Sequence, residues 1–237
     1  MKPGTLYLIP VPMGGDTLAD ILPTDVIATA QRLTHFVVEN AKTARAVLKQ
    51  FGTPHELRSL WMGELNEHSK EGELADLLAP LLAGHDVGLM SEAGCPGVAD
   101  PGANLVRLAH RHGIRVAPLV GPSSILLALM AAGANGQKFR FNGYLPAQEP
   151  ARSEAIRRLE QDSVRQGQAE LFIETPYRND ALFTALLATC RPGTQLTIAC
   201  GLTTADEQIA THPIAAWKNR ARPQINKRPT VFVLYAG

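Results

Sequence analysis

The chain has 237 residues, of which 45% are hydrophobic and 19% are charged, and its formal net charge is +1. This length and composition are typical of a globular protein with one large domain or two smaller ones. They exclude a disordered chain and a protein that is basic over its whole surface. A local basic patch is compatible with them, so they neither exclude nor indicate nucleic acid as a partner.

The chain contains three cysteines, Cys95, Cys190 and Cys200. Their number is odd, they form no Cys-x-x-Cys pair and no histidine lies at zinc-ligand spacing, so we expect free thiols, no metal site and a reducing, cytoplasmic location. The apolar stretch after Lys2 is short and is interrupted by Pro10 and Pro12, unlike a signal peptide. No apolar run approaches membrane-spanning length, so we expect no membrane partner.

The first half of the chain alternates strand-like and helix-like patterns. In chain order we predict a strand at residues 5–9, a helix at 23–31, a strand at 35–38, a helix at 41–51, a strand at 56–60, a helix at 70–83, a strand at 87–90, a helix at 103–112 and a strand at 115–118. Strands joined by crossover helices form a mainly parallel sheet with helices on both faces. The predicted fold class is therefore α/β.

Beyond Gly121 this rhythm changes. We predict a helix at residues 122–132, a strand at 138–142, a charged helix at 152–162, a strand at 169–173, a helix at 179–190, a strand at 195–200, a polar connection and a final strand at 230–235. This order indicates a second domain of mixed α/β structure. With the boundary near residues 118–122, the N-terminal α/β domain spans 1–118 and the C-terminal domain 119–237.

The most informative segment is the loop at residues 91–102, SEAGCPGVADPG, between a predicted strand and a predicted helix. Its glycines, prolines and alanines let the backbone approach a ligand closely, although a wide turn without a ligand has the same composition. A similar loop, residues 10–16, follows the first strand. Because the carboxyl ends of parallel strands lie at one edge of a sheet, we expect the two loops to converge on one ligand.

Common nucleotide and hydrolase motifs are missing: the chain has no Gly-x-Gly-x-x-Gly after a strand, no P-loop, no His-Glu-x-x-His and no Gly-x-Ser-x-Gly. Three segments instead occur in a characteristic order, LYLIPVPMG at 6–14, SEAGCPGVADPG at 91–102 and GPSS at 121–124. This ordered set resembles the tetrapyrrole methylase superfamily of S-adenosylmethionine-dependent methyltransferases. Within it the chain is most similar to the ribosomal RNA small subunit methyltransferase I branch, including FNGYLP at 141–146 and ETPYR at 174–178.

The resemblance implies a two-domain protein, a homodimer, that holds folded S-adenosylmethionine in a cleft between its domains. A sulfonium methyl donor needs little acid or base help, so small residues that position it and exclude water suffice. The residues that the resemblance assigns to cofactor binding are Pro10, Pro12, Gly14, Ser91, Glu92, Ala93, Gly94, Cys95, Val98, Ser123, Ser124, Thr175, Tyr177, Pro229 and Thr230. Cys95 replaces a threonine of the branch, and Tyr177 either stacks on the adenine or covers the cleft.

Besides Cys95, the chain departs from the branch in four places. It reads Glu39-Asn40-Ala41-Lys42 in place of Glu-Asp-Thr-Arg, Glu92 in place of Asp, and Gly201-Leu202-Thr203 in place of an Arg-Glu-Leu-Thr run, and it ends at Gly237 without the branch's C-terminal extension. We expect these departures to affect which acceptor is methylated more than they affect binding of the cofactor. Three functions are therefore open: methylation of RNA at a ribose 2′ oxygen of ribosomal RNA, methylation of a tetrapyrrole or other small molecule, and a non-catalytic cofactor-binding or interaction protein.

Three residues are candidates for acid–base chemistry, and none is decisive. Glu39 is either a general base or an acid that favours a helix N-terminus, and Asp100 is a second carboxylate that can accept a hydrogen bond. His68 lies in a loop where the branch also has a histidine, but a lone loop histidine is commonly just solvated. The catalytic residues are therefore left unassigned.

The predicted helix at 152–162 carries several arginines near one another. Arg152, Arg157, Arg158 and, just beyond it, Arg165 are interleaved with Glu154, Glu160 and Asp162. Such alternation is typical of a solvated helix face, so we do not assign this helix to phosphate binding.

Overall fold

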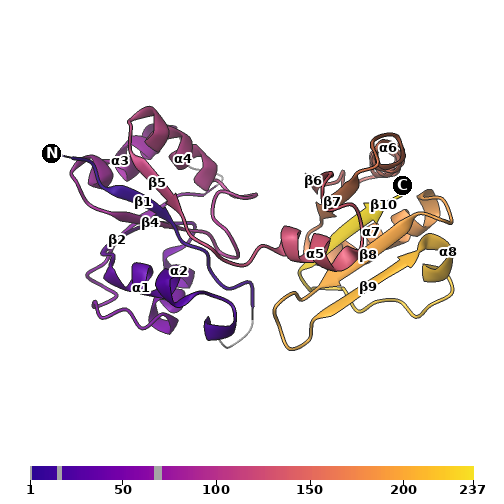
Figure 1. Cartoon of the computed structure of the whole chain (residues 1–237), viewed down its shortest axis with the longest axis horizontal. Coiled ribbons are helices and arrows are strands. Elements are labelled where there is room, and N and C mark those ends of the chain that lie inside the picture. The colour runs from indigo at the N-terminus through magenta and orange to yellow at the C-terminus, as the bar shows by residue number, and fades with distance from the viewer. Residues whose placement is uncertain (1, 15–17, 67–70) are drawn as a thin grey trace. The chain divides into compact units, whose positions relative to one another are not determined.

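A computed structural model describes residues 2–14, 18–66 and 71–237 of the chain (Figure 1). The chain divides into two units, Met1–Ser123 and Ser124–Gly237. The predicted boundary lies five residues earlier, between residues 118 and 119.

Five parallel strands form the sheet of the first unit, in the order β3-β2-β4-β1-β5. Its elements in chain order are β1 (Thr5–Leu8), η1 (Leu18–Asp20), α1 (Thr24–Arg32), β2 (His35–Val38), α2 (Ala41–Gln50), β3 (Trp61–Glu64), α3 (Glu71–Leu82), β4 (Val87–Met90), α4 (Gly102–Arg111) and β5 (Arg115–Pro118). The predicted α/β class with a parallel N-terminal sheet is confirmed.

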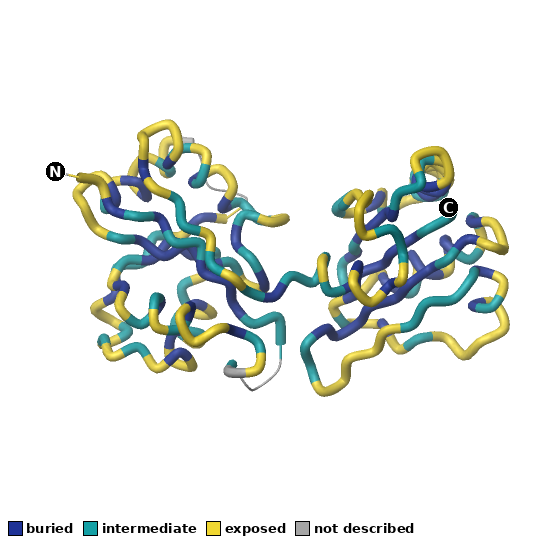
Figure 2. The backbone as a smooth tube through the Cα atoms, in the orientation of Figure 1, coloured by how far each residue is buried: buried dark blue, intermediate teal, exposed yellow. Residues whose placement is uncertain are grey.

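Helices cover both faces of this sheet because successive side chains of each strand point to opposite faces. Phe36 and Val38 of β2 pack in one cluster with residues of α1 and α2. Val37 of the same strand packs in the other cluster, with Leu78 of α3 and Leu105 of α4. Figure 2 shows the central strands β2 and β4 mostly in the dark blue of buried residues.

The predicted strand at 56–60 is wrong. Those residues form turns, and the strand begins at Trp61, whose N–H donates to the carbonyl oxygen of Thr34 at 3.0 Å. β3 is an edge strand with half-exposed side chains, so it lacks the continuous apolar pattern of a buried strand. A Cβ at Gly63 would collide with Leu77 of α3, so glycine allows this helix to pack closely on the strand.

The second unit has a mixed five-stranded sheet in the order β6-β7-β10-β8-β9, in which only the β6–β7 pair is parallel. Its elements are α5 (Ser124–Ala132), β6 (Phe139–Tyr144), α6 (Ala151–Gln166), β7 (Ala169–Ile173), η2 (Pro176–Arg178), α7 (Asn179–Thr189), β8 (Gln195–Cys200), β9 (Gln208–Pro213), α8 (Ile214–Trp217) and β10 (Thr230–Tyr235). The predicted polar connection between 200 and 230 thus contains an edge strand and a short helix.

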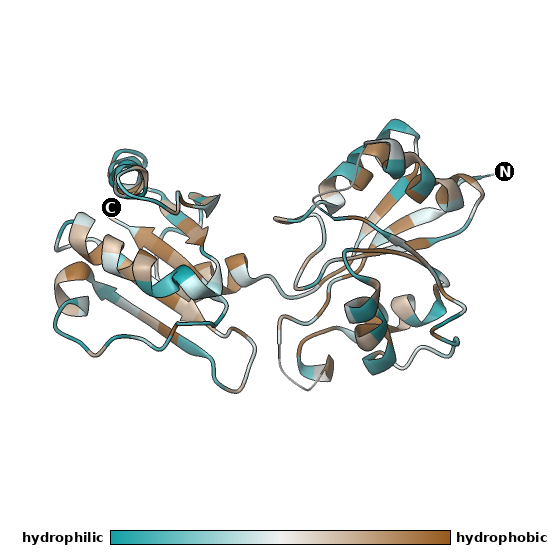
Figure 3. Cartoon of the chain, turned by 180° about the vertical axis from the view of Figure 1, so that it is seen from behind, coloured by the Kyte–Doolittle hydropathy of each residue, from teal (hydrophilic) through white to brown (hydrophobic). Residues whose placement is uncertain are grey.

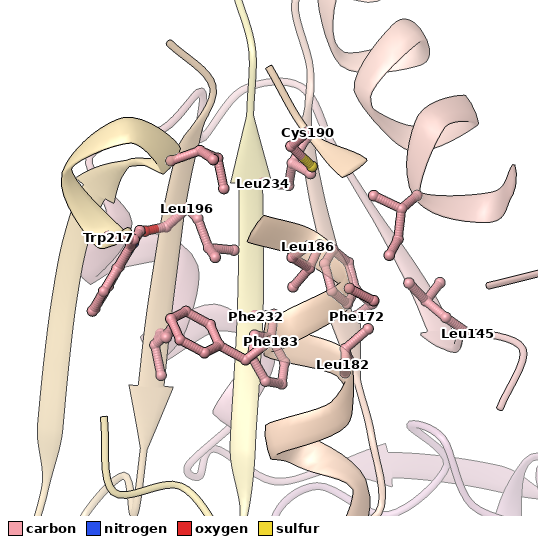
Figure 4. Close-up of a cluster of buried hydrophobic side chains, with 14 of the residues drawn as sticks. Leu145, Phe172, Leu182, Phe183, Leu186, Cys190, Leu196, Trp217, Phe232 and Leu234 are labelled. Carbon is pink, nitrogen blue, oxygen red and sulfur yellow. The ribbon is translucent and has the colours of Figure 1, made fainter. Parts of the chain in front are cut away.

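The core of the second unit lies between its sheet and the helices α6, α7 and α8. Phe172 and Phe232, on neighbouring strands, stack with ring centroids 5.8 Å apart, and Phe183 of α7 meets the edge of Trp217 (Figure 4). The Trp217 indole N–H donates to the carbonyl oxygen of Leu196 at 2.8 Å. The residues that follow α8 are therefore anchored to the core at their start.

Candidate functional site

The order of the first sheet places a topological switch between β1 and β4. These strands are neighbours, but the chain leaves β1 toward β2 and leaves β4 toward β5, on opposite sides of the pair. Open α/β sheets bind ligands outside the carboxyl ends of the strands at such a point. The loops that follow β1 and β4 are the two loops that the sequence predicts to converge.

Backbone hydrogen bonds join these two loops directly. The Val11 N–H donates to the Gly94 carbonyl oxygen at 2.9 Å, and the Gly94 N–H donates to the Val11 carbonyl oxygen at 3.1 Å. Two residues before Val11, the Ile9 N–H donates to the carbonyl oxygen of Leu89 at 2.9 Å. The predicted convergence of the two loops is therefore observed within the first unit.

The segment that follows β5 contacts both of these loops at the same edge of the sheet. The Cys95 thiol lies 3.2 Å from the carbonyl oxygen of Pro122, and a Cβ at Gly121 would collide with the ring of Pro10. Burial raises the pKa of the Cys95 thiol, which therefore stays protonated at neutral pH and is not a reactive nucleophile. Small residues at 94, 95 and 121 thus let three segments meet through their backbones.

Gly94 is buried and has a backbone φ of 72°, in the left-handed region that side chains disfavour. A Cβ there would lie 3.4 Å from the Pro122 carbonyl oxygen and 3.6 Å from the Met13 sulfur. The backbone conformation therefore favours glycine here, and a side chain longer than a methyl group would run into the neighbouring segments.

Asp100 holds the second part of the 91–102 loop in place. Its Oδ1 accepts from the N–H groups of Gly97 at 2.9 Å and Gly102 at 2.7 Å, and its Oδ2 accepts from Gly97 at 2.8 Å. Burial raises the pKa of this carboxyl, and these two amides oppose the increase. Both oxygens are thus engaged by the loop's own backbone, so we interpret Asp100 as a positioning residue.

A cavity of about 380 Å³ opens beside this loop. Its lining is mainly apolar and comes from the end of β1, the 95–98 segment, α4 and the residues after β5, namely Leu8, Cys95, Pro96, Gly97, Val98, Ala103, Val106, Pro118 and Leu119. Small-molecule sites typically occupy several hundred Å³ and are mostly apolar with a few polar groups. Val98 is 49% exposed, which leaves its side chain accessible to a ligand.

Glu39 and Glu92 lie at the carboxyl ends of β2 and β4. The Glu92 N–H donates to Glu39 Oε1 at 3.1 Å. Burial raises the pKa of Glu39, the Glu92 amide opposes this, and the charges of Asp100 and Glu92 raise it further. Asn40, where the branch has Asp, accepts from the Lys42 and Thr43 amides and caps α2, so this departure has a structural role in this chain.

The predicted segments of the second unit also meet one another. The Lys227 N–H donates to the Pro176 carbonyl oxygen at 3.0 Å, which joins the 175–177 segment to the residues before β10. Asn179, fully buried, donates through Nδ2 to the carbonyl oxygen of Arg228 at 2.8 Å and to Thr230 Oγ1 at 3.2 Å. The start of α7 is thus tied to the start of β10.

Glu174, which directly precedes the 175–177 segment, has a buried carboxylate. Its Oε1 accepts from the Thr175 N–H at 2.6 Å and from Arg178 Nη2 at 2.7 Å. Burial raises the pKa of Glu174, but the Arg178 and Thr175 hydrogen bonds outweigh it, and the net pKa is lowered. Glu174 Oε2 and Asn179 Oδ1 are buried acceptors for which no partner is found in the described part of the chain.

The other predicted site residues are placed as follows. Pro10 is buried, Pro12, Gly14, Ser91, Ser123, Ser124 and Thr175 are partly buried, Glu92, Ala93, Tyr177 and Pro229 are exposed, and Thr230 is buried. His68 lies outside the described residues. Among those that are described, no group of three or more His, Cys, Asp or Glu side chains is arranged to hold a metal ion.

Sequence reasoning assigned no role to two residues of this site, Asn179 and Glu174. Glu174 opens the ETPYR motif and Asn179 directly follows it, so the motif itself was the available signal. The partners of Asn179, Thr230 and Arg228, lie about fifty residues further on, and no local pattern in the chain links them.

Comparison with known proteins identifies the family. The family model for tetrapyrrole (corrin/porphyrin) methylases matches residues 5–217. The chain belongs to the tetrapyrrole methylase family. This tetrapyrrole methylase is an S-adenosylmethionine-dependent methyltransferase, as the sequence predicted.

Relatives and solved structures agree with this assignment. The ribosomal RNA small subunit methyltransferase I of Escherichia coli O157:H7 is 30% identical and covers 98% of this tetrapyrrole methylase, which spans 77% of that relative. Its namesake in Neisseria meningitidis serogroup A is 34% identical, with coverages of 98% and 76%. The crystal structure of the methyltransferase CobJ matches with a TM-score of 0.64 at 21% identity, covering 99% of this chain and 100% of that one. The uroporphyrin-III-C-methyltransferase of Thermus thermophilus matches at 0.57 and 17%, covering 98% and 94%.

The residues of this tetrapyrrole methylase fit its cofactor. In the first unit, a mainly apolar cavity opens beside the 95–98 segment. In the second unit, two buried oxygens, Glu174 Oε2 and Asn179 Oδ1, are acceptors of the kind that an amine or hydroxyl donor needs. Methyl transfer from a sulfonium requires this type of shaped, weakly polar site and no metal.

Proposed function

We propose that this protein methylates RNA, and that its acceptor is a ribose 2′ oxygen of ribosomal RNA. The observation that carries the proposal is the set of relatives at 30–34% identity over 98% of the chain, which are named as methyltransferases of small subunit ribosomal RNA. The solved neighbours, CobJ and a uroporphyrin-III-C-methyltransferase, are at most 21% identical, so their likeness supports the fold alone.

The cofactor supplies an activated methyl group when it is bound. We propose that the loops after β1 and β4, with Ser123, hold it from the first unit, and that Ser124, Thr175, Tyr177, Pro229 and Thr230 contribute from the second. The Val11–Gly94 bridge and the Asp100 hydrogen bonds support this role because they set the shape of the loops before a ligand arrives. The chain's contribution to the reaction is then mainly positioning and exclusion of water.

We propose Glu39 as the residue that accepts the proton of the acceptor hydroxyl. Its Oε1 is held by the Glu92 N–H, and no hydrogen-bond partner of Oε2 is found within the described residues. Burial raises the pKa of Glu39, which brings a carboxylate closer to the range where a general base works well. Asp100 is less suited to this task because the loop amides engage both of its oxygens.

We also propose that the protein is a homodimer and acts in the cytoplasm, where a ribosomal substrate would be found. No helix in the described ranges is long and apolar enough to cross a membrane. Light scattering coupled to size-exclusion chromatography tests the first statement, because a homodimer has twice the chain mass of 25.5 kDa.

The acceptor is tested by transfer of radiolabelled methyl groups from S-adenosylmethionine. Purified small ribosomal subunits that lack the modification are compared with a panel of porphyrinoids under the same conditions. The proposal predicts label in the ribosomal RNA and, after digestion, in a 2′-O-methylated nucleoside. Label in a porphyrinoid and none in RNA would show that the acceptor is a tetrapyrrole, and absence of turnover on every acceptor would support a non-catalytic role.

A further inference from the structure

All 22 Asp and Glu residues of the chain lie before Gln208, and the remaining residues, 208–237, carry five Lys and Arg. All five fall within residues 218–228, the segment KNRARPQINKR between α8 and β10. The chain as a whole has a net charge of only +1, so this segment concentrates positive charge on one part of the second unit. We call residues 218–228 the basic segment.

The backbone of the basic segment is fixed to the unit at several points. Trp217, which precedes it, is anchored to Leu196, and Ile225 in its middle is fully buried. The Asn179 side chain donates to the Ile225 carbonyl oxygen at 3.0 Å, and the Lys227 N–H donates to Pro176. The segment is therefore an ordered part of the fold and can present side chains in a defined arrangement.

Four of the five charged side chains of the basic segment are exposed to solvent. Lys218, Arg220, Arg222 and Lys227 are exposed, and no ion pair to any of them is found within the described ranges of the chain (Figure 3 shows the segment mostly in the hydrophilic colour). Arg228 donates to the carbonyl oxygens of Asp206 and Gln224, not to a carboxylate. The nearby Glu207 side chain accepts from the Thr203 N–H at 2.9 Å.

The charged helix α6 offers a useful contrast in the same unit. Its Arg165 pairs with Asp162 at 2.8 Å, and Arg157 and Arg158 follow Glu154 by three and four residues, the spacing at which side chains meet on a helix. Opposite charges thus surround the arginines of α6, whereas the basic segment has none of its own. This difference indicates that the basic segment attracts a polyanion.

We propose that the basic segment is a docking surface for the phosphate backbone of the RNA substrate, an inference that rests on RNA being the acceptor. The Lys227–Pro176 hydrogen bond places the end of this surface directly beside the 175–177 segment, which is proposed to bind the cofactor. By binding phosphates, Arg220 and Arg222 would therefore hold an RNA strand next to the 175–177 segment. Such contacts contribute affinity and orient the RNA, but they do not depend on its base sequence.

Two matched double variants test this surface. Arg220→Gln/Arg222→Gln and Arg157→Gln/Arg158→Gln each remove two exposed arginines from the second unit and lower the net charge by the same amount. Binding of a fluorescein-labelled single-stranded RNA oligonucleotide is followed by anisotropy over a range of salt concentrations. Each phosphate contact with a single strand contributes about 0.7 to the slope of log affinity on log salt.

The proposal predicts that Arg220→Gln/Arg222→Gln weakens RNA binding and lowers that slope by about 1.4, whereas Arg157→Gln/Arg158→Gln changes neither. Equal losses in the two variants would overturn it, because net charge alone would then explain the effect. Binding of the wild-type protein to phosphatidylserine vesicles but not to RNA, with loss in Arg220→Gln/Arg222→Gln, would overturn it in favour of a membrane surface.

A second measurement separates this proposal from the proposed function. Methyl transfer to small ribosomal subunits is measured for the wild-type protein and for Arg220→Gln/Arg222→Gln, with calorimetry of S-adenosylmethionine binding as a check on the fold. We expect a raised KM for the ribosomal substrate and unchanged cofactor affinity. Absence of transfer by the wild-type protein would contradict the proposed function, whereas transfer with an unchanged KM in the variant would contradict the docking surface alone.

Discussion

The two units of the molecule hold their predicted cofactor residues in place in different ways. In the first unit, parallel strands end in loops that meet through backbone hydrogen bonds between small residues, as Val11 and Gly94 do. In the second, buried side chains make the connections: Asn179 ties the start of α7 to the start of β10, and Glu174 holds Thr175 and Arg178 of its own segment. The arrangement in the first unit therefore depends on shape, and that in the second depends on hydrogen bonds made by buried polar side chains.

This difference predicts different responses to substitution. A larger side chain in the first unit should block the ligand while the sheet stays folded, because most residues of the two hydrophobic clusters lie in the helices and strands beneath the loops. A lost polar group in the second unit should lower the free energy of unfolding, because a buried donor or acceptor is then left without a partner.

The largest expected effect is on cofactor affinity in Gly94→Leu. The leucine would enter a buried position with φ 72° beside Pro122 and Met13, and we expect affinity for S-adenosylmethionine to fall by about 100-fold or more while the protein stays folded. Gly113→Leu is the matched control, because Gly113 has φ 66° and open space around it at the end of α4. It carries the same backbone strain without filling the loop. Calorimetry that gives equal affinities for the two variants would show that the cofactor lies elsewhere.

The second-largest expected effect is a loss of stability of the second unit in Asn179→Ala. Its Nδ2 serves two carbonyl oxygens and Thr230 Oγ1, so we expect the free energy of unfolding to fall by roughly 2–3 kcal/mol. The control is Asn219→Ala, which removes one exposed hydrogen bond to Ala215 and should cost less than about 0.5 kcal/mol. Similar losses in urea denaturation of both variants would mean that the buried network is not what stabilises this unit.

Glu174→Gln should have a smaller effect that depends on pH. Because the folded protein holds the pKa of Glu174 below its ordinary value of 4.5, the carboxylate stabilises the fold at neutral pH, and this contribution is lost as the pH falls through the lowered pKa. We expect a loss of about 1–2 kcal/mol at pH 7, allowing for the exposed guanidinium of Arg178. The difference from wild type should shrink well below pH 4. A difference that is constant with pH would exclude the ionised pair as its cause.

The smallest of these effects concerns the hydrogen bonds of Asp100. Asp100→Ala leaves the N–H groups of Gly97 and Gly102 without their acceptor, and we expect about fivefold weaker cofactor binding from a less ordered loop. Asp100→Asn keeps an acceptor oxygen within reach of both amides and should restore most of the affinity. If the asparagine variant is as impaired as the alanine variant, the charge of Asp100 matters more than its hydrogen bonds.

Much of the fold follows from patterns in the sequence, and the failures share a cause. β2, β4, β5, β7, β8 and β10 begin and end at the predicted residues. β3 and β9, which were misplaced or missed, are both edge strands. Their side chains are half exposed, so they lack the apolar runs that mark the central strands.

For the candidate site, the loops could be predicted from the sequence, but the hydrogen bonds that hold them in place could not. Composition and order indicated the 91–102 loop, because glycine and proline leave a local signal in the sequence. The Glu92–Glu39 bond and the Asn179–Thr230 bond join residues about fifty positions apart, and such pairs arise only from the folded arrangement. The basic segment had a signal, the absence of acids after Glu207, within a stretch that was treated as a polar connection.

The central claim is that the cofactor is held at the carboxyl edge of the first sheet by two loops. Backbone hydrogen bonds set the conformation of these loops before the cofactor binds. Amide hydrogen exchange, followed by mass spectrometry with and without S-adenosylhomocysteine, tests it most directly. The account predicts increased protection in peptides that cover residues 8–14 and 91–102, and none in β3, at the far edge of the same sheet. Tight binding with unchanged exchange in both loops would contradict it.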